Sequence, residues 1–368
     1  MAEPLKNVYT EQFVSDLCSS WKIVLPDLNE STFRQFVFKD DWNELELKQR
    51  MSRLSDAMKL ILPDDFILAA RLTRELISKL AADGFAVGGF EYMFIPEYIE
   101  KNGLAHLDIS LAALQHITQY TSCEFAIRPF ILENQKRSME FMLSCSMHQH
   151  PNVRRFASEG CRARLPWAMA LESFKQNASP IIPILENLKS DNSLFVRKSV
   201  ANNLNDISKD HPELALRMAK KWIGNNAETN WIVKHGMRTL LKSGHSEAMA
   251  LFGYAGSGAF TIKQSKVTTP TVPFGEYLKF QFNLKNRTSK EQIVRLEYAI
   301  HFLKSNGLQN KKIFKISERK LKGEETIFLQ KTHAIKPIST RKYYPGEHGL
   351  SLIVNGVEFE KHDFLLHM

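Results

Sequence analysis

Hydrophobic positions follow a helical period through the first two-thirds of the chain. In LKQRMSRLSDAMKLIL (47–62) and FILAARLTRELISKLAAD (66–83), apolar residues recur every three to four positions, which predicts two amphipathic helices. A Pro-Asp-Asp sequence separates them, and its carboxylates suit a helix start, where the macrodipole favours negative charge. We therefore expect helices up to about residue 257.

Beyond residue 257 the pattern alternates between apolar and polar positions, which is typical of strands. Asn355-Gly356 predicts a two-residue hairpin turn, because both residues tolerate positive φ. The segment 253–273 is rich in Gly, Ser, Thr and Pro, so we expect a linker there. Strands are predicted at EYLKFQFNL (276–284), IVRLEYAIHFL (293–303), ETIFLQ (325–330) and GLSLIVNGVEFE (349–360).

An internal repeat marks the helical part. Val153, Val196 and Val233 each precede a basic residue in similar segments, at offsets of 43 and 37 residues. That period is typical of HEAT-like helical repeats, in which stacked helix pairs form a curved solenoid with a concave surface. The predicted fold is an all-α HEAT-like repeat solenoid over residues 1–257, followed by an all-β, immunoglobulin-like sandwich over residues 258–368.

Composition narrows the class of protein. The 368 residues are 43% hydrophobic and 10% aromatic, which argues against a disordered chain. No apolar stretch is long enough to span a membrane, and the N-terminus does not resemble a signal peptide, so we expect no membrane partner. Four scattered cysteines suggest neither a disulfide framework nor a metal site, and we expect a cytoplasmic protein.

Net charge is unevenly distributed. Residues 1–124 carry −7, residues 125–257 carry +7 and residues 258–368 carry +9. The basic two-thirds could attract a polyanion such as nucleic acid, or could simply form a solvated surface.

Common catalytic signatures are missing from the sequence. There is no GxGxxG after a strand, no phosphate-binding GxxxxGK[ST], no HExxH and no GxSxG. The closest histidine pair, His148 and His150, has a spacing that does not bring two side chains together on a helix. We therefore expect neither a metal nor a cofactor.

Three carboxylates stand out within the basic repeats: Glu124, Glu159 and Asp206. One interpretation is that they form ordinary ion pairs, which usually contribute little, while Trp167 and Trp231 fill the repeat core. The other is chemical. Acids on a DNA-binding surface suit a cationic group, such as an N3-methylated adenine and the oxocarbenium ion that forms when its glycosidic bond breaks. Tryptophan faces can hold such cations.

The sequence resembles the AlkC-type bacterial alkylpurine DNA glycosylases of the AlkC/AlkD HEAT-like repeat superfamily. The resemblance is strongest in HPNVRRFASEGCRARLPWA (150–168) and FVRKSVANNLNDISKDHPE (195–213), and it extends to SCEFAIRPFI (122–131) and NWIVKHGMRTLLKSG (230–244). Some members of that family also carry a C-terminal immunoglobulin-like domain.

The resemblance implies a monofunctional, metal-free glycosylase that removes 3-methyladenine and 3-methylcytosine from double-stranded DNA in base-excision repair, without full base flipping. It implies that Glu159, Asp206 and Glu124 are the catalytic acids, and that Trp167 and Trp231 contact the lesion or its sugar. It implies that the β domain closes on the DNA. We expect a monomer, which is the simpler arrangement for an enzyme that wraps DNA. The candidate DNA-binding residues are Arg154, Arg162, Arg164, Lys198, Lys234 and Arg238.

Two other hypotheses share this fold. The chain could be a HEAT-like scaffold that binds DNA or RNA without chemistry, or a solenoid that binds proteins. Only a glycosylase needs acids in the middle of a basic surface. The three hypotheses therefore differ in the role that they give to Glu159 and Asp206.

Overall fold

The computed structural model describes residues 3–338 and 341–368 and divides the chain into two compact units. The first unit contains Met1–Ala215 and Lys221–Gly236, and the second contains Leu216–Lys220 and Met237–Met368. The fold class is as predicted, a helical region followed by an all-β region. The domain boundary at residue 257 stays a prediction. In the structure the last helices cluster with the strands, so the compact units divide before that residue.

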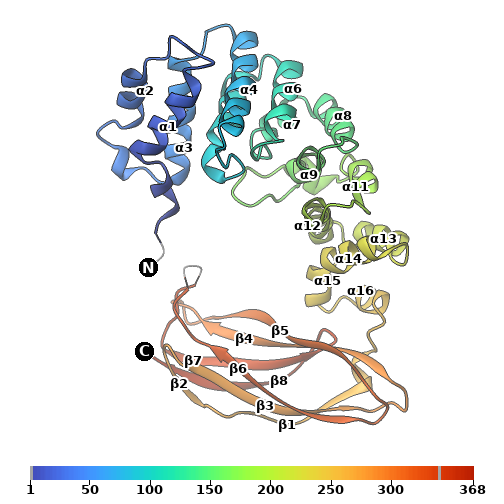
Figure 1. The fold of residues 1–368 in the computed structure, drawn as a ribbon. Helices are drawn as coiled ribbons and strands as arrows, with labels where there is room; N and C mark the ends of the chain where they lie inside the picture. Colours follow the sequence, from blue (N-terminus) through green and yellow to red (C-terminus); the bar gives the residue numbers. More distant parts are fainter. Residues whose placement is uncertain (1–2, 339–340) are drawn as a thin grey trace. The chain divides into compact units, whose positions relative to one another are not determined.

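Helices make up the first unit and follow one another along the chain in Figure 1. The predicted helix at 66–83 is present as α4, and the one at 47–62 ends early and continues as a short 3-10 turn. The α-helices are α1 (Glu11–Trp21), α2 (Glu30–Val37), α3 (Leu47–Ala57), α4 (Phe66–Ala82), α5 (Phe94–Asn102), α6 (Leu107–Ile117), α7 (Arg128–Glu133), α8 (Gln135–Cys145), α9 (Pro151–Gly160), α10 (Glu172–Gln176), α11 (Ile182–Leu188), α12 (Leu194–Asp210), α13 (Pro212–Trp222), α14 (Ala227–Gly236), α15 (Arg238–Lys242) and α16 (Ser246–Leu251).

The repeat seen in the sequence corresponds to equivalent helices. Val153, Val196 and Val233 lie on α9, α12 and α14, and all three side chains are fully buried. Helix α12 packs against both α9 and α14, so each repeat buries its apolar face on its neighbours.

Two sheets form the β part of the second unit. The order is β1-β3-β6 in one sheet and β2-β8-β7-β4-β5 in the other, and a shared apolar core includes Phe280, Phe282, Tyr298 and Leu352. Inward apolar residues alternate with outward polar ones along β3. The strands are β1 (Phe260–Val267), β2 (Thr271–Pro273), β3 (Tyr277–Asn286), β4 (Gln292–Leu303), β5 (Gln309–Leu321), β6 (Thr326–Ala334), β7 (Gly346–Val354) and β8 (Val357–His367).

The predicted Asn-Gly turn is present, and it explains why α15 and α16 belong with the strands. Asn355 and Gly356 have φ of 47° and 79° and join β7 to β8. The Asn355 side-chain amide donates to the carbonyl of Ala255 at 2.8 Å, and Gly356 lies against Gly244, which follows α15. The hairpin therefore anchors the end of the helical chain.

Two sequence predictions fail here. The expected linker 253–273 contains β1 and β2, because FTIKQSKV pairs along β3 despite its polar composition. Strand β5 was not predicted at all. It is an edge strand whose lysines face solvent, so its sequence lacks a clear apolar alternation.

Candidate active site

Three segments of the first unit bring the predicted acids together. Glu124 lies in the turn before α7, Glu159 in the last turn of α9, and Asp206 about one turn before the end of α12. Their exposed fractions are only 4%, 6% and 1%. Carboxylates this deeply buried are rare unless they are paired, so their partners define the site.

Arg162 joins two of these acids. Its Nη1 donates to Oε1 of Glu159 at 2.6 Å, and its Nε donates to Oδ2 of Asp206 at 2.9 Å. Lys209, one turn further along α12, holds the other Asp206 oxygen at 2.9 Å. Both oxygens of Asp206 are thus engaged by cations.

Arg155 adds the third acid to this group. We call the set formed by Glu124, Arg155, Glu159, Arg162 and Asp206 the acid–guanidinium cluster. Arg155 forms an ion pair with Glu124, and its Nη2 lies 3.9 Å from Oε1 of Glu159. Its guanidinium also lies over the ring of Phe195, 4.3 Å from the centroid. The hydrogen bond from Arg162 falls on Oε1 of Glu159, and no described residue donates a hydrogen bond to Oε2.

Burial and charge oppose each other at Arg162. Burial lowers the pKa of its guanidinium, but Glu159 and Asp206 together outweigh burial and raise that pKa above its ordinary value. The cluster therefore differs from the surface ion pairs considered in the sequence, because it sits where desolvation is expensive and each charge depends on its partners.

Arg128 was not identified from the sequence, and it positions the site. This buried side chain donates to the backbone carbonyls of Gly160 at 3.0 Å, Arg162 at 2.8 Å and Met169 at 2.7 Å. Burial lowers the pKa of Arg128 to about 10. Arg128 ties the end of α9 to the following loop, and its place in the AIRPF motif gave no sign of this role.

Trp167 projects from that loop. Its side chain is 68% exposed, and its φ of 69° lies in the left-handed region that bulky residues rarely occupy. Lys48 donates a hydrogen bond to its carbonyl. A strained, exposed tryptophan is typical of a functional position rather than of the repeat core. Trp231 also lies at the surface, where its indole stacks on His235 of the same helix at 5.1 Å.

The arginine that follows the valine holds a loop in the repeats of α9 and α12. Arg154 donates to the carbonyls of residues 148 and 149 and pairs with Asp191, with its Nε 2.5 Å from Oδ2. Arg197 makes the same pair of bonds one repeat later, to the carbonyls of residues 191 and 192. In both repeats the arginine holds the loop that precedes its own helix.

The other predicted DNA-binding residues occupy different settings. Arg162 is 6% exposed and bound to two acids, so we do not retain it as a phosphate contact. Arg164 is exposed and pairs with Asp210, with its Nε 3.0 Å from Oδ2. Lys198 is exposed on α12, Lys234 is half-buried on α14, and Arg238 begins α15 in the second unit.

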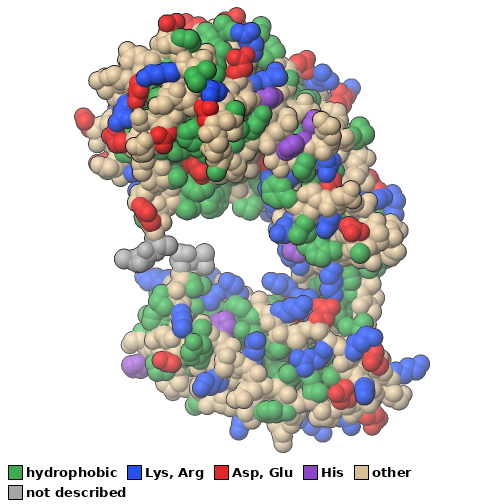
Figure 2. Space-filling view, in the orientation of Figure 1, with side chains coloured by type: hydrophobic (Ala, Val, Ile, Leu, Met, Phe, Trp, Pro, Cys, Tyr) green, Lys and Arg blue, Asp and Glu red, His purple; other side chains and the backbone are tan. Residues whose placement is uncertain are grey.

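The second unit carries a basic hollow of its own. Lys304, Lys312 and Lys342 line it, and the Arg341 guanidinium lies 3.8 Å from the centroid of the Phe302 ring. Lys and Arg side chains are also spread over the visible face of the β strands in Figure 2. We call the surface lined by Lys304, Lys312, Arg341 and Lys342 the β-unit hollow.

Residues 3–338 and 341–368 contain no group of three or more His, Cys, Asp or Glu side chains arranged to hold a metal ion. In the same part of the chain, every helix is too short or too polar to cross a membrane.

Fold and site together define a helical-repeat protein with a buried acid–guanidinium cluster and an appended immunoglobulin-like unit. Residues 261–368 match a family described as "Uncharacterised protein YhaZ, C-terminal Ig-like domain". The YhaZ protein of Bacillus subtilis (strain 168) is 41% identical over 360 residues, which cover 98% of each chain.

A solved structure extends the similarity to the whole molecule. The Pseudomonas fluorescens alkylpurine DNA glycosylase AlkC, bound to DNA containing an abasic site analog, matches with a TM-score of 0.93 at 33% identity, covering 100% of both chains. The chain belongs to the AlkC family of alkylpurine DNA glycosylases. The resemblance noted in the sequence is confirmed.

Proposed function

We propose that this protein is a monofunctional DNA glycosylase that hydrolyses the N-glycosidic bond of cationic methylated bases, such as 3-methyladenine and 3-methylcytosine, in double-stranded DNA. The observation that carries the proposal is the buried cluster in which Arg162 joins Glu159 to Asp206, next to the exposed Trp167 loop. Membership of the AlkC family and that relative's abasic-site ligand support it.

The chemistry needs little beyond electrostatics and one water. The C1′–N bond breaks with its electron pair moving to the base, which leaves as a neutral molecule because it carried the positive charge. The deoxyribose becomes an oxocarbenium ion, which negative charge stabilises. Water adds to C1′ and loses its proton to a carboxylate, leaving an abasic site in an intact strand.

The contacts divide the roles of the acids. Glu159 has an oxygen that receives no hydrogen bond from a described residue, so it orients and deprotonates the water. Asp206, with both oxygens bound to cations, contributes negative charge and fixes Arg162. Glu124 holds Arg155 at the edge of the cluster and supports Glu159.

Aromatic and basic residues bind the rest of the DNA in this proposal. The exposed indoles of Trp167 and Trp231 contact the lesion or its sugar. Arg164, Lys198, Lys234, Arg238 and the β-unit hollow contact phosphates, whereas Arg154 shapes its loop. The protein acts as a monomer.

Release of free methylated bases from methylated DNA, without added metal, tests the proposal. We expect 3-methyladenine to appear together with abasic sites in unbroken strands. Tight, salt-sensitive DNA binding without base release would contradict it and favour a non-catalytic DNA- or RNA-binding scaffold.

A further inference from the structure

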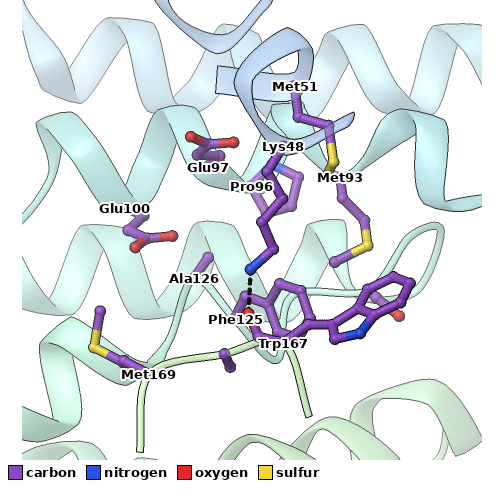
Figure 3. A pocket seen from close by; sticks show the side chains of 12 residues that line it. Lys48, Met51, Met93, Pro96, Glu97, Glu100, Phe125, Ala126, Trp167 and Met169 are labelled. Carbon is purple, nitrogen blue, oxygen red and sulfur yellow. Dashed lines mark hydrogen bonds between the residues drawn. The ribbon is translucent and has the colours of Figure 1, made fainter. Parts of the chain in front are cut away.

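A cavity of about 200 Å³ lies in the first unit (Figure 3). The rings of Phe125 and Trp167 face it from one side, and the carboxylates of Glu97 and Glu100 from the other. It is smaller than the ~300–1,000 Å³ pockets that take drug-sized ligands, and its size suits a single base.

The cavity and the cluster share two segments of chain. Phe125 directly follows Glu124, which holds Arg155 in the cluster. The loop that carries Trp167 follows Arg162, and Arg128 holds both ends of this loop through the carbonyls of Arg162 and Met169. Through these carbonyls Arg128 bridges a residue of the cluster, Arg162, and a residue of the cavity lining, Met169.

The lining suits a flat, polarisable ligand. Met51, Met93 and Met169 contribute thioethers, which pack well against aromatic rings. Lys48 lies between the carboxylates and the rings in Figure 3, but it is bound to the Trp167 carbonyl and lies 5.4 Å from the centroid of the Phe125 ring. The Trp167 side chain is 68% exposed, so most of its indole is available for stacking.

The two carboxylates of this cavity differ in their partners. Glu97 pairs with Lys101 at 3.3 Å, whereas no hydrogen bond or ion pair joins Glu100 to another described residue. An unpaired, half-buried carboxylate is unfavourable by itself and accepts a hydrogen bond readily from an N–H group.

We propose that this cavity holds the released base: an N-methylated purine or pyrimidine that stacks on Trp167 and donates its exocyclic amine N–H to Glu100. The inference rests on the proposed glycosylase function, because only that reaction produces such a base at the cluster. Both 3-methyladenine and 3-methylcytosine carry the required amine. Bound product then delays turnover, and free base inhibits the enzyme.

The test is calorimetric titration of the full-length protein at pH 8.5, where Glu100 is ionised because its pKa is about 7, with free 3-methyladenine and in parallel with 3-methylhypoxanthine, whose carbonyl oxygen replaces the amine. We expect saturable binding of 3-methyladenine and at least tenfold weaker binding of 3-methylhypoxanthine, because its oxygen faces a carboxylate. Glu100→Gln should weaken 3-methyladenine about tenfold and remove most of this discrimination. The exposed Glu133→Gln is the matched control and should change neither.

Equal binding of both bases, or Glu100→Gln that binds 3-methyladenine like the wild-type protein, overturns the inference. A wild-type enzyme that excises 3-methyladenine but does not bind the free base overturns the inference and leaves the proposed function standing. A protein that binds the base but never excises it contradicts the proposed function instead.

Discussion

The two oxygens of Glu159 have different surroundings. This difference predicts the effect of replacing its carboxylate with the amide of glutamine. Glu159→Gln keeps an acceptor oxygen for Arg162 but removes the charge that stabilises an oxocarbenium ion and takes a proton from water. We expect the single-turnover excision rate to fall by about 10²–10³-fold while affinity for abasic-site DNA stays within a few-fold.

Controls separate this effect from misfolding. Thermal unfolding of Glu159→Gln should remain cooperative, and Asp206→Asn should also lose excision. Glu172→Gln removes a carboxylate from an exposed pair with Lys175 and should excise normally. Wild-type excision by both Glu159→Gln and Asp206→Asn would refute the assignment of the acids.

Glu100 makes stability depend on pH. Burial first, then the nearby charge of Glu97, raises the pKa of Glu100 to about 7, against the opposing charges of Lys101 and Lys48. The folded state therefore binds more protons than the unfolded state between pH 4.5 and 7, so this residue makes the protein less stable as pH rises through that window.

Glu100→Gln should remove that loss. We expect it to raise the free energy of unfolding by about 1–2 kcal/mol at pH 8, a figure reduced for solvent screening, and to change it little at pH 4.5. Urea unfolding at both pH values measures this. An equal gain at both would show that burial of the Glu100 charge is not the cause.

At the scale of elements, the close approach of Gly244 to Gly356 is one of the contacts that hold α15 and α16 against the β7–β8 turn. Gly244 has a φ of 73°, and a Cβ there would lie 2.5 Å from the Gly356 carbonyl oxygen. Gly244→Ala should therefore destabilise the second unit by about 2–3 kcal/mol, through both backbone strain and steric clash. Gly224→Ala offers a control, because its φ of 90° is equally unfavourable but its Cβ would point into open space.

Denaturant unfolding of the two variants separates the contributions. Gly224→Ala should lose only about 1 kcal/mol, the effect of backbone conformation. If both variants lose the same amount, the contact between Gly244 and the turn contributes nothing.

At the scale of the whole molecule, the net charge of +9 on residues 258–368 implies a large electrostatic share in DNA binding. Replacing Lys304, Lys312 and Lys342 of the β-unit hollow with Gln should weaken binding and reduce the slope of log K against log salt by up to about 3, since each lost phosphate contact removes about 0.9. These substitutions keep α15 and α16 covered, which deletion of the strands would not.

The control replaces Lys22, Lys39 and Lys59 in the acidic first third of the chain, at the same cost in net charge. It should leave the salt slope near the wild-type value. Equal slopes for the wild-type protein and the β-unit variant would show that the hollow does not contact phosphates.

Local patterns determined much of this molecule. Helical period and repeat spacing predicted the solenoid. Val153, Val196 and Val233 occupy equivalent buried positions, because the period of apolar residues decides which face of a helix packs. Asn355-Gly356 predicted its hairpin, since turn conformation depends on the residues themselves. The edge strand β5 was missed because solvent-facing lysines erase the apolar signal.

Tertiary structure alone decided which side chains meet. Arg162 binds Asp206 across 44 residues of chain and Lys48 binds Trp167 across 119 residues, distances over which sequence spacing carries no information. The sequence therefore identified the three acids by type and family resemblance but not their pairing. It could not show that Arg154 holds a loop or that Glu100 is left unpaired, because burial and side-chain direction arise only when the helices pack.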